Sequence, residues 1–109
     1  MSEVRITGAE GPDGLSLRTV GLSARGRPEL AVSDLPPYLG HGWARVLGAL
    51  AGHVAGVPEV PAEVTLAPGL VVRLRRSGDV LTPVPSDPDR DPDEWRREIV
   101  VRLFPEAGT

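Results

Sequence analysis

The chain has 109 residues, 40% of them hydrophobic, and a formal net charge of −3, which excludes the low-hydrophobicity, high-charge composition of disordered proteins. A chain of this length supports one modest core, so we expect a single domain over residues 1–109. Cysteine is absent, which excludes a disulfide framework, a thiolate nucleophile and a zinc finger. The pI near 5.3 argues against a nucleic-acid partner.

The chain begins Met1-Ser2-Glu3 and shows neither the basic segment nor the apolar segment of a signal peptide. No apolar run approaches the roughly 20 residues that a membrane-spanning helix needs. We therefore expect a cytoplasmic protein without a membrane partner. All twelve basic residues are arginine, a bias that, with abundant Ala, Gly, Pro and Val, is typical of GC-rich bacterial genomes.

Three strands are predicted in the first third of the chain. Residues 3–7 alternate polar and apolar side chains, and residues 15–22 do the same after a glycine-rich turn, so the two segments are expected to form a hairpin. A third strand is predicted over residues 29–33. Pro36 and Pro37 then indicate the start of a helix.

The main helix is predicted over residues 37–55, where apolar residues follow a helical period. They are Leu39, Trp43, Val46, Leu47, Leu50 and Val54. At 100° per residue they form one stripe, which is the pattern of a helix that covers one face of a sheet. Gly56 and Pro58 are predicted to end it.

The second half of the chain is predicted to form further strands and a short helix. The expected strands cover residues 63–66, 70–76, 80–84 and 99–104. A short helix over residues 92–97 is expected before the last strand, with Asp91 as its cap. The fold class is therefore α+β: a mainly antiparallel sheet of five to six strands with one long helix packed on one face and a short helix before the last strand.

Small residues recur every four positions along the main helix. Gly40, Ala44, Gly48 and Gly52 form this row, and each glycine in a helix interior is unfavourable by roughly 1 kcal/mol relative to alanine. Close approach of another backbone would explain them, either within this chain or in a partner. We interpret the row as a candidate interaction surface.

Arginines form a second candidate surface. Arg25 and Arg27 flank Gly26 in a predicted loop, where they are placed to meet an anion or an acidic partner. Several further arginines are expected to share one exposed face of the sheet, where cross-strand ion pairs are the alternative interpretation. They are Arg5, Arg18, Arg73, Arg75 and Arg102.

Glu29, His41 and His53 form a candidate polar site, because a carboxyl group and an imidazole are the groups that general acid–base chemistry uses. The two histidines lie twelve residues apart on the same predicted helix, so they cannot share a metal ion. The acidic run that begins at Asp87 has Pro92 where a calcium-binding loop needs glycine. No metal and no cofactor are expected.

Residues 14–56 resemble the DUF4262 family of small bacterial domains. The resemblance rests on the segments Thr19-Val20-Gly21-Leu22 and Gly26-Arg27-Pro28-Glu29-Leu30 and on the helix that follows them. This chain departs from the family pattern at Arg18, where the family usually has Tyr, and at Arg27, where it usually has His. The resemblance implies a small bacterial domain without an assigned activity.

No cluster of residues pairs a nucleophile or base with an orienting partner, so we expect a non-catalytic protein-interaction or accessory module. Its partner would be another protein or a second copy of the chain in a homodimer. The alternative is a small-molecule hydrolase or transferase that uses Glu29 with His41 or His53 in a cleft between helix and sheet. The sequence leaves open whether the protein is an enzyme.

Overall fold

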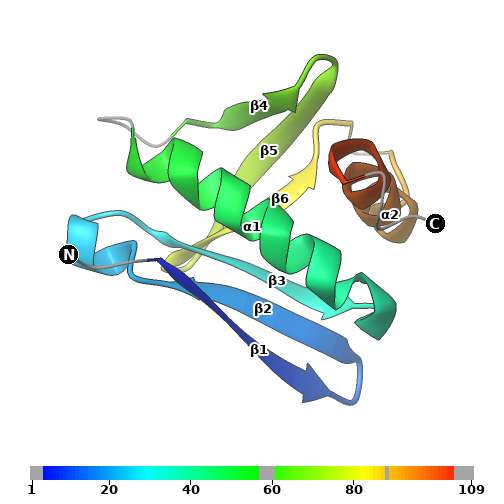
Figure 1. The fold of residues 1–109 in the computed structure, drawn as a ribbon, viewed down its shortest axis with the longest axis horizontal. Coiled ribbons are helices and arrows are strands. Elements are labelled where there is room, and N and C mark those ends of the chain that lie inside the picture. The colour runs from blue at the N-terminus through cyan, green and yellow to red at the C-terminus, as the bar shows by residue number, and fades with distance from the viewer. Residues whose placement is uncertain (1–3, 57–60, 88, 105–109) are drawn as a thin grey trace.

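The computed structural model describes residues 4–56, 61–87 and 89–104, without the side chain of Arg25. These residues form a six-stranded sheet and two helices, which confirms the predicted α+β class (Figure 1). The strands are β1 Arg5–Gly11, β2 Gly14–Val20, β3 Glu29–Leu35, β4 Glu63–Ala67, β5 Leu70–Ser77 and β6 Val80–Pro85. The helices are α1 Gly40–Ala55 and α2 Pro92–Leu103, with short 3-10 turns at Ser23–Arg25 and Pro37–Leu39.

The sheet has the strand order β1-β2-β3-β6-β5-β4, and every neighbouring pair is antiparallel except β3 with β6. That parallel pairing covers only two positions and ends at Leu30 opposite Leu81. Pro83 and Pro85 follow in β6 and lack a backbone N–H, yet both stay paired with β5. Their nitrogens must therefore face β3, where they offer no hydrogen bond. The two strands separate beyond this point.

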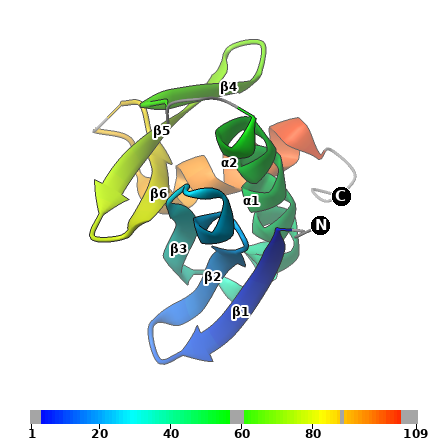
Figure 2. The same cartoon turned by 90° about the vertical axis from the view of Figure 1, so that its left-hand side faces the viewer.

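The sheet curves around α1, which lies along its concave face (Figure 2). Trp43, Val46, Leu47 and Leu50 of α1 are fully buried against apolar side chains that alternate along the strands. The core therefore lies between α1 and the inner face of the sheet, and the other face carries exposed arginines together with some apolar residues such as Val20. Among the described residues, no helix is both long and apolar enough to cross a membrane.

The last element is a helix, so the predicted strand over residues 99–104 is wrong. Alternation of Ile99, Val101 and Leu103 fits a strand, but Trp95, Ile99 and Val100 form the buried stripe of a helix that continues to Leu103. This stripe packs against α1, and Val101 is left 43% exposed. Tertiary packing therefore selected the helical period.

The predicted cap at Asp91 and the predicted start of α2 are confirmed, and the long helix is confirmed with a small shift at its start. The Asp91 carboxylate accepts a hydrogen bond from the N–H of Asp93 at 3.2 Å. The long helix begins at Gly40 as an α-helix, after the 3-10 turn at Pro37–Leu39. Glu3 of the first predicted strand and Pro58 lie outside the described residues.

Candidate functional site

The outer face of β5 carries arginine side chains because of the alternation along this strand. Val72 and Leu74 are buried in the core, so Arg73 and Arg75 between and after them point to the face away from α1. Arg76 follows at the exposed end of the strand. A single eight-residue strand thus presents three guanidinium groups to solvent.

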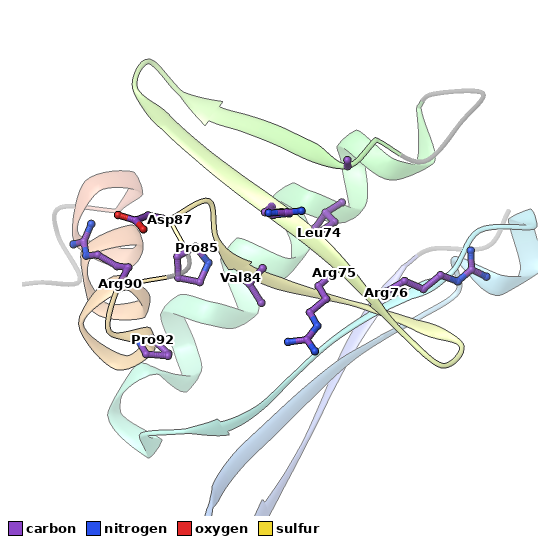
Figure 3. A pocket seen from close by; sticks show the side chains of 10 residues that line it. Leu74, Arg75, Arg76, Val84, Pro85, Asp87, Arg90 and Pro92 are labelled. Atoms are coloured by element: carbon purple, nitrogen blue, oxygen red, sulfur yellow. The ribbon is translucent and has the colours of Figure 1, made fainter.

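These arginines line a hollow of about 580 Å³, which we call the arginine groove (Figure 3). Its lining residues are Ala62, Arg73, Leu74, Arg75, Arg76, Val84, Pro85, Asp87, Arg90 and Pro92. In Figure 3, Asp87 and Arg90 lie at the end near α2, and Arg76 lies at the opposite end. The groove therefore extends across β5 and β6 to the segment that leads into α2.

The arginine groove is lined by more arginines than carboxylates, although Glu63 of β4 lies opposite Arg73 in the strand register. Four guanidinium groups line it, against the single carboxylate of Asp87. Arg90 forms an ion pair with Glu98 of α2. Within the described part of the chain, the side chains of Arg73, Arg75 and Arg76 make no hydrogen bond or ion pair. These three groups are available to carboxylate or phosphate oxygens.

A second hollow, of about 240 Å³, lies at the start of α2 and has the opposite charge. It is lined by Tyr38, Asp91, Asp93, Glu94 and Arg97, and we call it the acidic hollow. Three carboxylates there face one guanidinium group. Tyr38, which also lines this hollow, is 72% exposed. The acidic hollow is suited to a cationic side chain, which carboxylates bind and an aromatic face attracts.

Glu29 is buried, and its carboxylate is held by the turn that follows β2. It accepts hydrogen bonds from the hydroxyl of Thr19 at 2.8 Å and from the backbone N–H groups of Gly21, Leu22 and Ser23 at 3.2, 3.2 and 2.9 Å. Gly21 has φ 123°, a conformation that favours glycine and turns these N–H groups toward the carboxylate. Glu29 therefore links the start of β3 to the end of β2.

The charge state of Glu29 follows from these contacts. Burial alone raises the pKa of its carboxyl group, but hydrogen bonds from Ser23, Thr19 and Gly21 outweigh burial and lower the pKa to about 2. The group is ionised at neutral pH, and its oxygens are already bonded within the protein. It is therefore poorly suited to take or give a proton in a reaction.

The two histidines lie apart from Glu29. Both are exposed on α1, His41 in its first turn and His53 in its last. His41 lines a hollow of about 280 Å³ with Tyr38, Arg97 and Val101, among others, and Glu29 is not part of it. Within the described residues, no hydrogen bond or ion pair joins Glu29 to either histidine. The structure does not bring the three side chains into one site.

The row of small residues on α1 passes from the core to solvent. Gly40 is buried, and a Cβ placed there would lie 2.4 Å from Cδ2 of Leu15. Ala44 is half-buried, whereas Gly48 and Gly52 are exposed and a Cβ on either would meet no atom within 4 Å. A step of four residues turns 40° around a helix axis, so the row leaves the core gradually. Packing within the chain explains Gly40 only.

The remaining predicted arginines lie on three different surfaces. Arg5 and Arg18 are exposed on β1 and β2, and Arg27 is half-buried, with its backbone N–H donating to the carbonyl of Leu22 at 3.0 Å. The side chain of Arg25 lies outside what the structure describes. The prediction that Arg102 lies on the sheet is wrong, because Arg102 belongs to α2, where it pairs with Glu98.

Arg76 and Arg90 belong to the arginine groove but were not among the residues that the sequence pattern identified. Arg76 stands at a position of β5 whose alternation predicts a core side chain, although the strand has already left the core there. Arg90 lies in the acidic run before α2, far from β5 in sequence. The two consecutive arginines Arg75 and Arg76 at the end of a strand were a signal that could have identified Arg76. No local signal pointed to Arg90.

A scan against protein-family models and searches of curated proteins and of solved structures find no match for this chain. The resemblance of residues 14–56 to the DUF4262 family stays a prediction.

Proposed function

We propose that this chain is a non-catalytic protein-interaction module that binds an acidic segment of its partner in the arginine groove. The observation that carries this proposal is the set of three guanidinium groups, Arg73, Arg75 and Arg76, that line one hollow without a bonded partner in the described part of the chain. Guanidinium groups bind carboxylates through two parallel hydrogen bonds, which gives orientation as well as attraction.

The shape of the groove supports an extended peptide as the ligand. Its lining residues run from the end of β5 across β6 to the start of α2, so successive carboxylates of one segment could each meet a different arginine. Val84 and Pro85 provide apolar contact between the charged ends. The net charge of −3 of the whole chain disfavours a nucleic acid, because such partners require a broad basic surface. The setting we propose is the cytoplasm.

The alternative of a hydrolase or transferase that uses Glu29 with His41 or His53 has less support. The Glu29 carboxylate has a pKa of about 2 and is bonded to the turn that follows β2. No hydrogen bond joins it to a histidine within the described residues. An acid–base pair needs both groups within reach of one substrate.

Fluorescence anisotropy with a labelled deca-glutamate peptide tests the proposal. Wild-type protein should bind the peptide at low ionic strength, and the double variant Arg73→Gln/Arg75→Gln should bind it about tenfold more weakly because two charge-assisted contacts are lost. The double variant Arg5→Gln/Arg18→Gln is the matched control, since it removes the same charge from β1 and β2 and should bind as the wild type does.

Equal weakening in both variants would mean that the peptide responds only to net charge, and the groove would then have no special role. Absence of peptide binding to the wild type at low ionic strength would also contradict the proposal. A labelled oligo-thymidine of similar charge provides the comparison with nucleic acid. Tighter binding of that oligonucleotide than of the peptide, lost in Arg73→Gln/Arg75→Gln, would replace the protein partner by a nucleic acid.

A further inference from the structure

We infer that the acidic segment bound in the arginine groove comes from a second copy of this chain, and that it is the surface around the acidic hollow at the start of α2. This inference rests on the proposed function and names the partner. The result is a reciprocal homodimer in which the groove of each copy receives carboxylates from the other.

The two hollows have complementary charges. The arginine groove is lined by four arginines, of which Arg90 is paired with Glu98, and by the carboxylate of Asp87, whereas the acidic hollow has three carboxylates against the guanidinium group of Arg97. Glu94 makes no hydrogen bond or ion pair within the described part of the chain. The acidic hollow therefore holds carboxylate oxygens that can bind an arginine of another molecule.

The two hollows are neighbours on the surface. Pro92 lines the arginine groove, whereas Asp91 and Asp93 on either side of it line the acidic hollow. The start of α2 thus separates two adjacent sites of opposite charge. A two-fold axis that passes beside this helix end would bring the arginine groove of each copy onto the acidic hollow of the other. In a two-fold interface every contact occurs twice, so both pairs of hollows would meet.

One chain cannot make the same contact with itself. Asp91 is fixed as the cap of α2 through its bond to the N–H of Asp93. Asp93 lies 3.7 Å from Arg96 of its own helix, which holds it on that side of Pro92. The carboxylates of Asp91 and Asp93 thus have contacts within α2 rather than with Arg73 or Arg75 of the same copy.

Tyr38 gives the second copy an additional contact. This residue is 72% exposed and lines both the acidic hollow and the hollow that includes His41. An arginine that enters the acidic hollow can stack its planar guanidinium group on this ring while it binds the carboxylates. An exposed aromatic side chain would then be covered in the dimer.

Sedimentation velocity of complementary charge variants tests the inference. Arg73→Glu/Arg75→Glu makes the groove negative, and Asp93→Arg/Glu94→Arg makes the acidic hollow positive. The wild type should dimerise at about 0.05 M salt and dissociate at about 0.5 M, where charges are screened. Each variant alone should dimerise at least about a hundredfold more weakly, since like charges would face each other. An equimolar mixture should recover the dimer, because both reciprocal contacts are then between opposite charges.

Matched controls place the same charge changes elsewhere. Arg5→Glu/Arg18→Glu and Glu10→Arg/Asp13→Arg alter exposed residues of β1, β2 and their turn and should dimerise as the wild type does. Far-UV circular dichroism of every variant checks that it is folded. If one of the groove or hollow variants does not fold, the salt dependence of the wild-type dimer and the association of the remaining variant still test whether the dimer forms through these two surfaces.

A wild type that stays monomeric at low salt, or a mixture that does not recover the dimer, would overturn the inference. The deca-glutamate experiment separates this failure from failure of the proposed function. A monomeric protein that binds the peptide through Arg73 and Arg75 would keep the acidic-segment proposal and point to a different protein as the partner. A monomer that does not bind the peptide would reject both.

Discussion

The hydroxyl of Thr19 donates a 2.8 Å hydrogen bond to the buried carboxylate of Glu29, and the same hydroxyl oxygen accepts one of 2.8 Å from the N–H of Leu30. Two neighbouring strands and the turn between them are therefore tied together by one threonine and one glutamate. The hydrogen bonds offset the cost of burying the charge of Glu29, so this buried carboxylate can have a structural role.

Acid should destabilise the protein through Glu29. The folded-state pKa of about 2 lies below the ordinary value of 4.5, so the bonded carboxylate contributes stability above pH 4.5 and loses it as the pH falls toward 2. We expect a loss of about 3 kcal/mol in the free energy of unfolding from this group. Urea unfolding followed by circular dichroism across this pH range measures it.

The variant Glu29→Gln isolates that contribution. Its amide group puts an N–H donor where the carboxylate accepted hydrogen bonds, so we expect about 2 to 3 kcal/mol lower stability at neutral pH and a weaker loss in acid. Glu63→Gln, at an exposed position of β4, is the control and should leave both quantities unchanged. A parallel pH profile for wild type and Glu29→Gln would show that Glu29 is not the responsible group.

Two glycines of α1 should respond in opposite directions to alanine. A Cβ at Gly42 would lie 2.5 Å from Cγ1 of Val100 in α2, so Gly42→Ala should lower stability by about 1 to 3 kcal/mol. A Cβ at Gly48 would meet nothing within 4 Å, so Gly48→Ala should raise stability by up to about 1 kcal/mol. Thermal unfolding of the two variants measures both effects.

The variant Gly48→Ala also tests the small-residue row as an interaction surface. Close approach of a partner backbone at Gly48 would make Gly48→Ala weaken self-association in sedimentation velocity. The dimer that we propose forms through the arginine groove and the acidic hollow. We therefore expect Gly48→Ala to associate as the wild type does.

The contact between α1 and α2 should depend on Trp43. Its indole N–H donates to the carbonyl of Arg96 at 3.0 Å, and its ring lies 5.7 Å from that of Trp95. Trp43→Phe should therefore lower stability by about 1 to 2 kcal/mol. Trp95 becomes the single tryptophan in this variant, so its fluorescence reports the environment of α2. An emission maximum unchanged on unfolding would contradict the buried position of Trp95.

Gly14 should be among the least replaceable residues of the sheet. It has φ 138°, and a Cβ there would lie 2.7 Å from the carbonyl oxygen of Leu35 and 3.0 Å from the carbonyl carbon of Asp34. Backbone atoms cannot move aside easily, so Gly14→Ala should lower stability by at least about 2 kcal/mol. Gly78 has φ 62° but open space around it, so Gly78→Ala should cost only about 1 kcal/mol. Equal losses in the two variants would show that the contact at Gly14 is not limiting.

The sequence alone predicted the features that depend on neighbours along the chain. The apolar stripe of α1, the alternation in β5 and the carboxylate cap at Asp91 are all local, and the structure confirms them. The strand predicted over residues 99–104 was wrong because Ile99, Val101 and Leu103 satisfy a strand pattern while Val100 packs on Gly42 of α1 only from a helix. A short apolar segment fits both periods, and the packed partner decides between them.

The groups that define the site were brought together only by tertiary structure. Local pattern placed Arg73 and Arg75 on the polar face of a strand, but it could not show that the segment with Asp87 and Arg90 returns to the same face. Likewise, the sequence marked Glu29 as a candidate for acid–base chemistry, but its low pKa arises from the hydroxyl of Thr19 and from the N–H groups that the turn at Gly21 directs at its carboxylate. Side-chain periodicity is set by the local backbone, whereas the fields and hydrogen bonds that give a charged group its role come from residues distant in the chain.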